Sequence, residues 1–192
     1  LAREGLRFTD AHAPGSVCVP SRFGLLTGRY PFRRHVSWKI DRANLRPGGL
    51  NLASLLKGRG YGTACVGKWH LGFGCDHPTE AGQEMPGGPV DVGFDRFFGM
   101  WASLDIPPYY YIEDGRCVQP PSEHVEASPG TGPRAIQGPF WRAGGIAPGL
   151  RHEEVMPTFV EKAVDIIDGH AAKSANEPLF LYFPLPAPHT PW

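Results

Sequence analysis

The sequence predicts an α/β fold in which a mostly parallel sheet carries helices on both faces. Short apolar runs typical of buried strands, at residues 63–67 and 179–185, alternate with segments of helical periodicity, at 51–58 and 153–172. Strands that are apolar along their whole length are typical of parallel sheets covered on both sides. With 192 residues, the chain can bury a sizeable core as part of one domain.

The first predicted elements are a strand and a short helix. Residues 6–11 alternate apolar and polar side chains, which predicts a strand. Pro20 suits the first turn of a helix and Gly28 suits a helix end, so we expect a helix from about Pro20 to Thr27. Cys18 would then lie just before the helix, where free N–H groups and the helix dipole favour an anion such as sulfate.

Arg22 follows Cys18 by four residues, so both can lie on one side of the first helical turn. Its guanidinium is always charged and suits oxyanions. The alternative interpretation is a buried cysteine with an arginine on the surface.

The middle of the chain predicts a helix, a strand and a loop in succession. Asn51 can cap a helix that runs to about Gly58. Residues 63–67 then form a strand, residues 75–89 are rich in Gly and Pro and form a loop, and the apolar residues 92–101 contain a further strand.

The later elements are separated by a long irregular stretch. Residues 107–149 contain many Pro, Gly and Ser residues and no helical period, with an edge strand expected at 109–112. Residues 153–172 have the apolar spacing of an amphipathic helix, and residues 179–185 form a buried strand.

Chemically interesting side chains follow the predicted strands. Cys18 comes after the first strand, Lys68 and His70 after the strand at 63–67, and His189 after the last strand. Ligands of parallel sheets bind beyond the carboxyl ends of strands, so these side chains should share one site. In an extended segment Lys68 and His70 project to the same face, where they would offer positive charge and proton exchange.

The charges of the chain balance, since 19 Lys and Arg residues match 19 Asp and Glu residues. No global field therefore favours nucleic acid or a membrane surface as partner, and any preference for anions must be local. No apolar run is long enough to span a bilayer.

The cysteines form no C-x-x-C zinc or redox pair. Cys65 lies in an apolar run and is predicted to be a core residue. With Cys18 reserved for chemistry, a bridge between Cys75 and Cys117 remains open in an oxidising compartment.

Four segments of the chain carry a family resemblance. Residues 18–29 read C-V-P-S-R-F-G-L-L-T-G-R, residues 67–72 read G-K-W-H-L-G, residues 93–99 read G-F-D-R-F-F-G, and residues 188–191 read P-H-T-P. In this order they resemble the motifs of the type I sulfatases, which are formylglycine-dependent enzymes of the alkaline-phosphatase-like superfamily. The resemblance implies the fold of that superfamily, incomplete in this chain.

The resemblance implies hydrolysis of sulfate monoesters. The aldehyde made from Cys18 would be the nucleophile after hydration to a diol, and Arg22 would stabilise that diol. Lys68 would bind the sulfate oxygens, His70 would take a proton during sulfate release, and His189 would protonate the leaving oxygen. Ser103 falls where some arylsulfatases carry a hydroxyl that contacts substrate.

The resemblance also implies one calcium ion, with formylglycine at Cys18 among its ligands. The family's remaining ligands are two acidic pairs that match nothing in these 192 residues. We therefore expect a part of one catalytic domain, truncated at both ends, with little or no activity as an isolated fragment.

The implied partners are a sulfated small molecule or glycan and a formylglycine-generating maturation enzyme. The family also implies export to a periplasmic, secreted or lysosomal compartment. Residues 107–149 are the candidate for substrate selection. Two alternatives remain open: a phosphate or phosphonate ester hydrolase of the same superfamily, and a non-catalytic protein that binds sulfated glycans.

Overall fold

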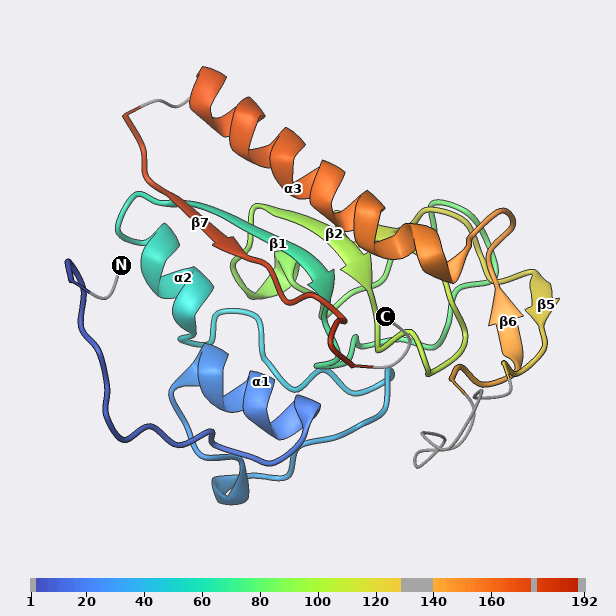
Figure 1. The fold of residues 1–192 in the computed structure, drawn as a ribbon, viewed down its shortest axis with the longest axis horizontal. Coiled ribbons are helices and arrows are strands. Elements are labelled where there is room, and N and C mark those ends of the chain that lie inside the picture. The colour runs from blue at the N-terminus through green and yellow to red at the C-terminus, as the bar shows by residue number, and fades with distance from the viewer. Residues whose placement is uncertain (1–2, 129–139, 174–175, 190–192) are drawn as a thin grey trace.

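The computed structural model describes residues 3–128, 140–173 and 176–189. Among these residues, five strands form the main sheet in the order β4-β3-β2-β1-β7 (Figure 1). The central strand β1 (Gly62–Lys68) is parallel to β2 (Arg96–Met100) and to β7 (Leu179–Tyr182). The short strands β3 (Ile112–Glu113) and β4 (Arg116–Cys117) extend the sheet in antiparallel fashion.

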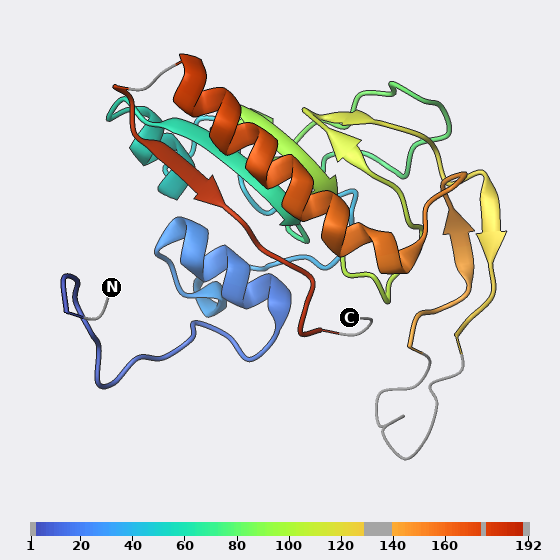
Figure 2. The same cartoon turned by 45° about the horizontal axis from the view of Figure 1, so that its top comes forward.

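Helices cover both faces of the sheet, as predicted. The long helix α3 (His152–Lys173) crosses one face over β1 and β2 (Figure 2). The helices α1 (Cys18–Thr27) and α2 (Leu52–Lys57) lie on the other side of the sheet (Figure 1). The 3-10 turns η1 (Pro31–Arg33) and η2 (Val90–Val92) are the remaining helical segments of the described chain.

The alternation of side chains along each strand supplies the apolar layer on each face. Val66 of β1 and Phe98 of β2 belong to the cluster that contains Phe159 of α3. Cys65 and Phe97, one residue earlier on the same strands, belong instead to the cluster that contains α1. The sheet is therefore buried on both sides, which explains why its parallel strands are mostly apolar.

The helix predicted at 51–58 begins with a capping box. The Asn51 side chain accepts hydrogen bonds from the backbone N–H groups of Ala53 and Ser54, and the Ser54 hydroxyl accepts one from the Asn51 N–H. These bonds satisfy donors that a helix N-terminus otherwise leaves unpaired. The six-residue helix α2 therefore forms where the sequence predicts it.

Helix α3 follows from its apolar spacing. Val155, Phe159 and Ala163 recur every four residues and are buried against the sheet. Pro157 is the sixth residue of the helix, so the helix lacks the hydrogen bond that an N–H at this position would donate to the Glu153 oxygen.

Helix α1 begins two residues earlier than predicted. Cys18 is its first residue rather than a residue before it, and Val17 is the N-cap. The end of the helix agrees with the prediction, because Gly28 takes a left-handed conformation with φ of 65° and donates a hydrogen bond to Gly24.

The strand predicted at residues 6–11 is wrong. These residues join no sheet, and the side chains of Leu6 and Phe8 are largely exposed. An alternating segment forms a strand only where it can pair with another strand and pack its apolar side chains against a core. Among the described residues, this segment does neither.

Other predicted strands are shorter or shifted. The strand expected at 92–101 is confined to β2, preceded by the turn η2, and the strand expected at 179–185 ends at Tyr182. The edge strand expected at 109–112 is also wrong, because Tyr109 is fully buried and bridges Ile146 while β3 starts only at Ile112.

The stretch 107–149 contains short paired strands rather than irregular chain alone. Besides β3 and β4, the described residues hold a small sheet of β5 (Glu123–Val125) and β6 (Gly144–Ile146). Residues 129–139 of this stretch lie outside the described chain.

The cysteines are unbonded in this structure. Cys65 is buried in the core, as predicted, and the bridge left open between Cys75 and Cys117 is not formed. A bilayer-spanning helix is not found among the described residues.

Candidate active site

The predicted site residues meet at the carboxyl end of β1. Arg22 of α1 donates a hydrogen bond from Nη1 to the backbone oxygen of Lys68, the last residue of that strand. The Arg22 guanidinium also lies against the phenol of Tyr182 at the end of β7, and burial raises the pKa of that phenol. Arg22 thus joins α1 to two neighbouring strands.

Lys68 is a buried cation next to Cys18. It is 2% exposed, and burial lowers the pKa of its ammonium group to about 8. The adjacent Cys18 side chain and Asp105 oppose this shift, because a negative group nearby favours the charged amine. Lys68 can therefore present positive charge beside Cys18, at the first turn of α1.

His70 lies beside Lys68 but is not in extended backbone as predicted. Its φ is +55°, a left-handed conformation that is uncommon outside glycine. The ring is held edge-on between the indoles of Trp38 and Trp101, with centroids 5.9 and 6.3 Å away.

Burial, with Lys68 nearby, lowers the pKa of His70 to about 3. The imidazole is therefore neutral near pH 7. Its Nδ1 atom is buried without a hydrogen-bond partner among the described residues. A neutral imidazole keeps one nitrogen that can accept a proton, although a pKa of about 3 makes His70 a weak base near pH 7 in this state of the site.

The segment after β7 brings His189 to the same place. The Lys68 N–H donates a 2.9 Å hydrogen bond to the Pro184 oxygen, which holds this segment against the end of β1. The contact requires Gly67, whose φ is +126° and where a Cβ atom would meet the Pro184 oxygen at 2.5 Å. The side chain of His189 is 40% exposed and lies close enough to His70 to influence its charge.

Asp105 is a member of this cluster that sequence reasoning missed. Its side chain is only 14% exposed, and Oδ1 lies 3.7 Å from Nδ1 of His189. Oδ2 lies 3.5 Å from Nη2 of Arg142. One sequence signal could have identified Asp105 as a site residue. It follows β2 closely, at the carboxyl edge of the parallel strands where Lys68 also lies.

Ser103 lies in the same turn after β2 but is not at the surface of the cluster. It is 1% exposed, and its hydroxyl oxygen is buried without a hydrogen-bond partner in the described chain. Its backbone oxygen accepts a 3.0 Å hydrogen bond from the Ile106 N–H and closes the turn.

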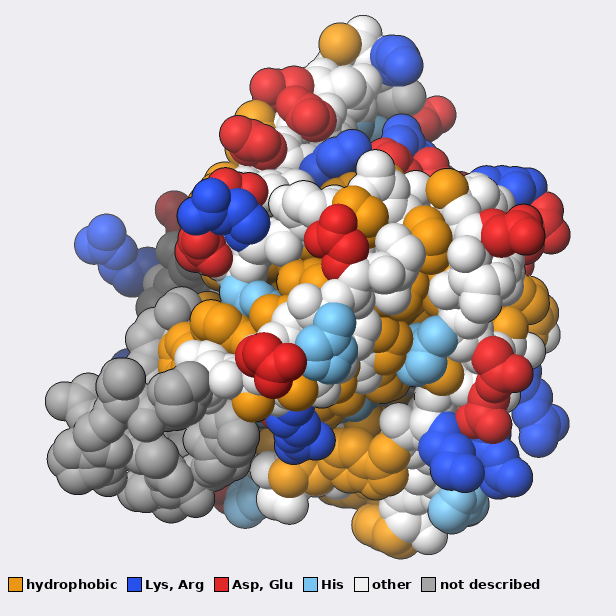
Figure 3. Space-filling model, turned by 90° about the vertical axis from the view of Figure 1, so that its right-hand side faces the viewer, with side chains coloured by type: hydrophobic (Ala, Val, Ile, Leu, Met, Phe, Trp, Pro, Cys, Tyr) orange, Lys and Arg blue, Asp and Glu red, His pale blue; other side chains and the backbone are white. Residues whose placement is uncertain are grey.

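The side of the molecule at the carboxyl ends of β1 and β2 displays several histidine side chains among hydrophobic ones (Figure 3). Carboxylates are sparse in this part of the site. No group of three or more His, Cys, Asp or Glu side chains among the described residues is placed to hold a metal ion. These residues therefore do not fit a metal centre on their own.

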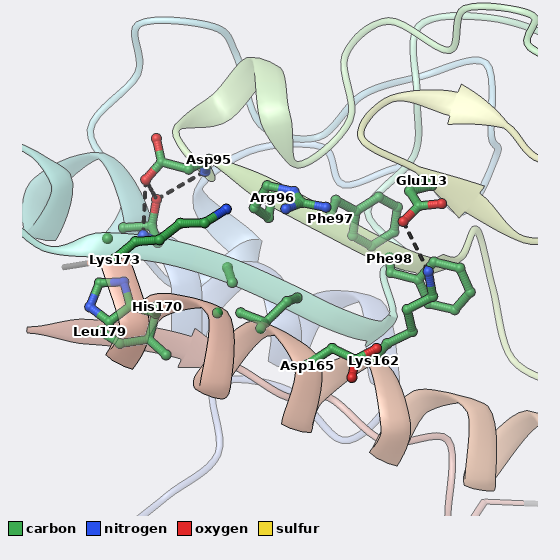
Figure 4. Close-up of a pocket in the computed structure, with 15 residues that line it drawn as sticks. Asp95, Arg96, Phe97, Phe98, Glu113, Lys162, Asp165, His170, Lys173 and Leu179 are labelled. Atoms are coloured by element: carbon green, nitrogen blue, oxygen red, sulfur yellow. Dashed lines mark hydrogen bonds and ion pairs between the residues drawn. The ribbon is translucent and has the colours of Figure 1, made fainter. Parts of the chain in front are cut away.

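A cavity of about 350 Å³ beneath α3 is separate from the cluster (Figure 4). Its lining includes the first residues of β1 and the ion pair between Lys162 and Glu113, whose Nζ and Oε1 atoms are 3.0 Å apart. Asp95, at its rim, accepts hydrogen bonds from the backbone and hydroxyl of Thr63. It lies at the opposite edge of the parallel strands from Lys68.

Comparison with known proteins shows which proteins the chain resembles. The sulfatase family model matches residues 1–192. The N-acetylgalactosamine-6-O-sulfatase of Bacteroides thetaiotaomicron is 29% identical over all of this chain and 42% of its own length. Human arylsulfatase A is 41% identical over 56% of this chain and 20% of its own length.

A solved structure agrees with these matches. A Bacteroides thetaiotaomicron protein from work on the metabolism of multiple glycosaminoglycans superimposes with a TM-score of 0.75 at 29% identity, covering 97% of this chain and 44% of that one. The chain thus spans less than half the length of the relatives that it matches from end to end.

Proposed function

The chain belongs to the sulfatase family, and on that premise we propose that the protein of which it is part hydrolyses sulfate monoesters through a nucleophile made from Cys18. The observation that carries the proposal is the convergence of Cys18, Arg22, Lys68 and His70 at one strand end. A nucleophile position beside a buried lysine, a partly buried arginine and a neutral imidazole suits attack on an anionic ester.

Each residue takes the role in the reaction that its charge allows. Lys68 and the first turn of α1 bind the sulfate oxygens and stabilise the negative charge that grows on them. Arg22 fixes the geometry between α1 and β1 and adds positive charge next to Cys18. His70, neutral at pH 7, accepts a proton when sulfate is released, while the more exposed His189 donates one to the leaving oxygen.

The modification of Cys18 to formylglycine would supply a hydrated aldehyde as the attacking oxygen. A maturation enzyme that makes formylglycine is therefore a proposed partner. We also propose a calcium ion, with most of its ligands elsewhere in the longer protein, since the described residues do not fit such a site.

The proposed substrate class is the sulfated glycan. The relative that matches the whole chain is a sulfatase of N-acetylgalactosamine 6-sulfate, and the superimposed structure comes from glycosaminoglycan metabolism. Such substrates lie outside the cytoplasm, which agrees with the export that we propose for this protein.

The test uses the full-length protein, made with its maturation enzyme. We expect turnover of 4-methylumbelliferyl sulfate and of N-acetylgalactosamine 6-sulfate, and the mass of the Cys18 peptide should match formylglycine. The Cys18→Ala variant should lose at least about 1,000-fold in kcat/KM, while Cys75→Ser should not. Preference for the phosphate ester of the same phenol would favour a phosphohydrolase, and binding without turnover would favour a glycan-binding protein.

A further inference from the structure

We propose that Asp105 is a positioning residue for His189, holding its imidazole so that the opposite ring nitrogen faces the leaving oxygen. This inference rests on the proposed sulfatase activity and adds a residue to it. Asp105 lies outside the sulfatase motifs found in the sequence and emerges only from the packing of three distant segments.

The geometry of the carboxylate points to this role. Oδ1 of Asp105 is buried and forms no hydrogen bond among the described residues. Nδ1 of His189 lies 3.7 Å from this oxygen. An unpaired buried carboxylate oxygen is costly, so a protein keeps one where another state of the site uses it.

A small closing of this distance would make a hydrogen bond from Nδ1–H to the carboxylate. In such a pair the carboxylate fixes which ring nitrogen carries a proton and how the ring is turned. Nε2 then carries the second proton of the imidazolium and points away from Asp105. The side chain of His189 is 40% exposed, so a substrate can approach its ring from the solvent.

Charges around Asp105 hold it in place. Arg142 contacts the other oxygen, Oδ2, at 3.5 Å, and the Lys68 ammonium is near enough for Asp105 to favour its charged form. Arg142 comes from the stretch 107–149, and its backbone oxygen accepts a 2.9 Å hydrogen bond from the buried Tyr109. Arg142 thus contacts one carboxylate oxygen, while the other lies near His189.

The step that Asp105 supports is protonation of the leaving group. The deprotonated oxygen of the hydrated aldehyde made from Cys18 forms a bond to sulfur while the bond between sulfur and the ester oxygen breaks, and the electron pair of the broken bond passes to the ester oxygen. The proton on Nε2 of the His189 imidazolium moves to the same oxygen, so an alcohol leaves and a neutral imidazole remains. Asp105 stabilises the imidazolium before the transfer and is itself unchanged.

The experiment compares two leaving groups in the full-length, matured protein. Sugar sulfates release an alkoxide that needs a proton, whereas 4-nitrophenyl sulfate releases a stable phenolate that does not. We expect Asp105→Asn to lower kcat for N-acetylgalactosamine 6-sulfate by about tenfold or more, and for 4-nitrophenyl sulfate by less than about threefold. His189→Ala should show the same selectivity, and the double variant should lose little more.

The matched control is Asp95→Asn, a carboxylate at the other edge of the sheet, which should not distinguish the two substrates. If Asp105→Asn fails to fold, Arg142→Gln carries the test, because this side chain is 61% exposed. It should show the same selectivity to a smaller extent.

An equal loss for both substrates, or no loss, would overturn the role of Asp105 while leaving the sulfatase proposal intact. A wild-type protein that is matured at Cys18 yet cleaves neither sulfate would instead overturn the proposed function, and this inference with it.

Discussion

Arg22 donates a hydrogen bond to the backbone oxygen of Lys68, so the helix that begins at Cys18 is fastened to the end of the central strand. The same guanidinium lies against Tyr182 of β7. One side chain therefore sets the distance between the proposed nucleophile and the proposed sulfate-binding lysine. A planar, forked cation can serve both contacts at once, whereas a lysine offers only a point charge.

Replacing Arg22 with lysine should therefore lower activity even though the charge is kept. We expect kcat/KM of the full-length protein for 4-methylumbelliferyl sulfate to fall about 10- to 100-fold. Thermal unfolding should show a loss of about 1–2 kcal/mol from the missing hydrogen bond. Arg29→Lys, at an exposed position just beyond the end of the same helix, is the control, and equal activity in both variants would contradict the prediction.

The buried imidazole of His70 should make the protein sensitive to acid. Its pKa is about 3 in the fold against 6.5 ordinarily, so the unfolded chain binds the proton more tightly between these values. Stability contributed by His70 is complete above pH 6.5 and is lost as the pH falls toward 3.

The measurement is urea unfolding of wild type and His70→Gln at pH 7 and at about pH 4.5. The wild type should lose about 2–3 kcal/mol more than the variant between these conditions. The control is His124→Gln, at an exposed position, which should not change the dependence of the unfolding free energy on pH. Parallel pH curves for wild type and His70→Gln would show that His70 is not buried as described.

Ser103 offers a test that separates substrate contact from packing. Its hydroxyl is buried without a partner in the described chain, so Ser103→Ala should leave stability unchanged or slightly raised. If the hydroxyl contacts substrate, KM for a sulfated sugar should rise about 5- to 10-fold with little change in kcat. An unaltered KM would make Ser103 a core residue only.

Phe159 should be the main anchor of helix α3. It is fully buried and packs edge-on against Phe98 of β2, with ring centroids 6.2 Å apart. Phe159→Ala should cost about 3–5 kcal/mol in unfolding free energy. The exposed Glu161→Ala on the same helix serves as the control and should change stability by less than about 0.5 kcal/mol.

Much of the fold is predictable because its signals are local. The capping residue Asn51, the four-residue spacing in α3 and the apolar run of β1 each appear within a few consecutive residues. The strand expected at 6–11 shows the limit of such signals. Its pattern is local, but a strand needs a partner, and no neighbouring strand receives it.

The sequence predicts only part of the site, because some of its residues carry no local signal. Cys18, Lys68 and His189 lie in recognisable motifs, and the structure brings them together even though, from residue 3 on, no strand precedes Cys18. Asp105 is a single aspartate in a loop, and its contacts with Arg142 and His189 join residues far apart in the chain. Nothing near Asp105 in the sequence indicates these partners.

The pairing of β1 with β7 also sets an order of events during synthesis. Gly62 pairs with Leu179, so β1 leaves the ribosome long before its partner on that side exists. Pairing between strands so distant is slow, and N-terminal segments must wait for it. Until β7 docks, Cys18 lies beside an unfinished sheet edge.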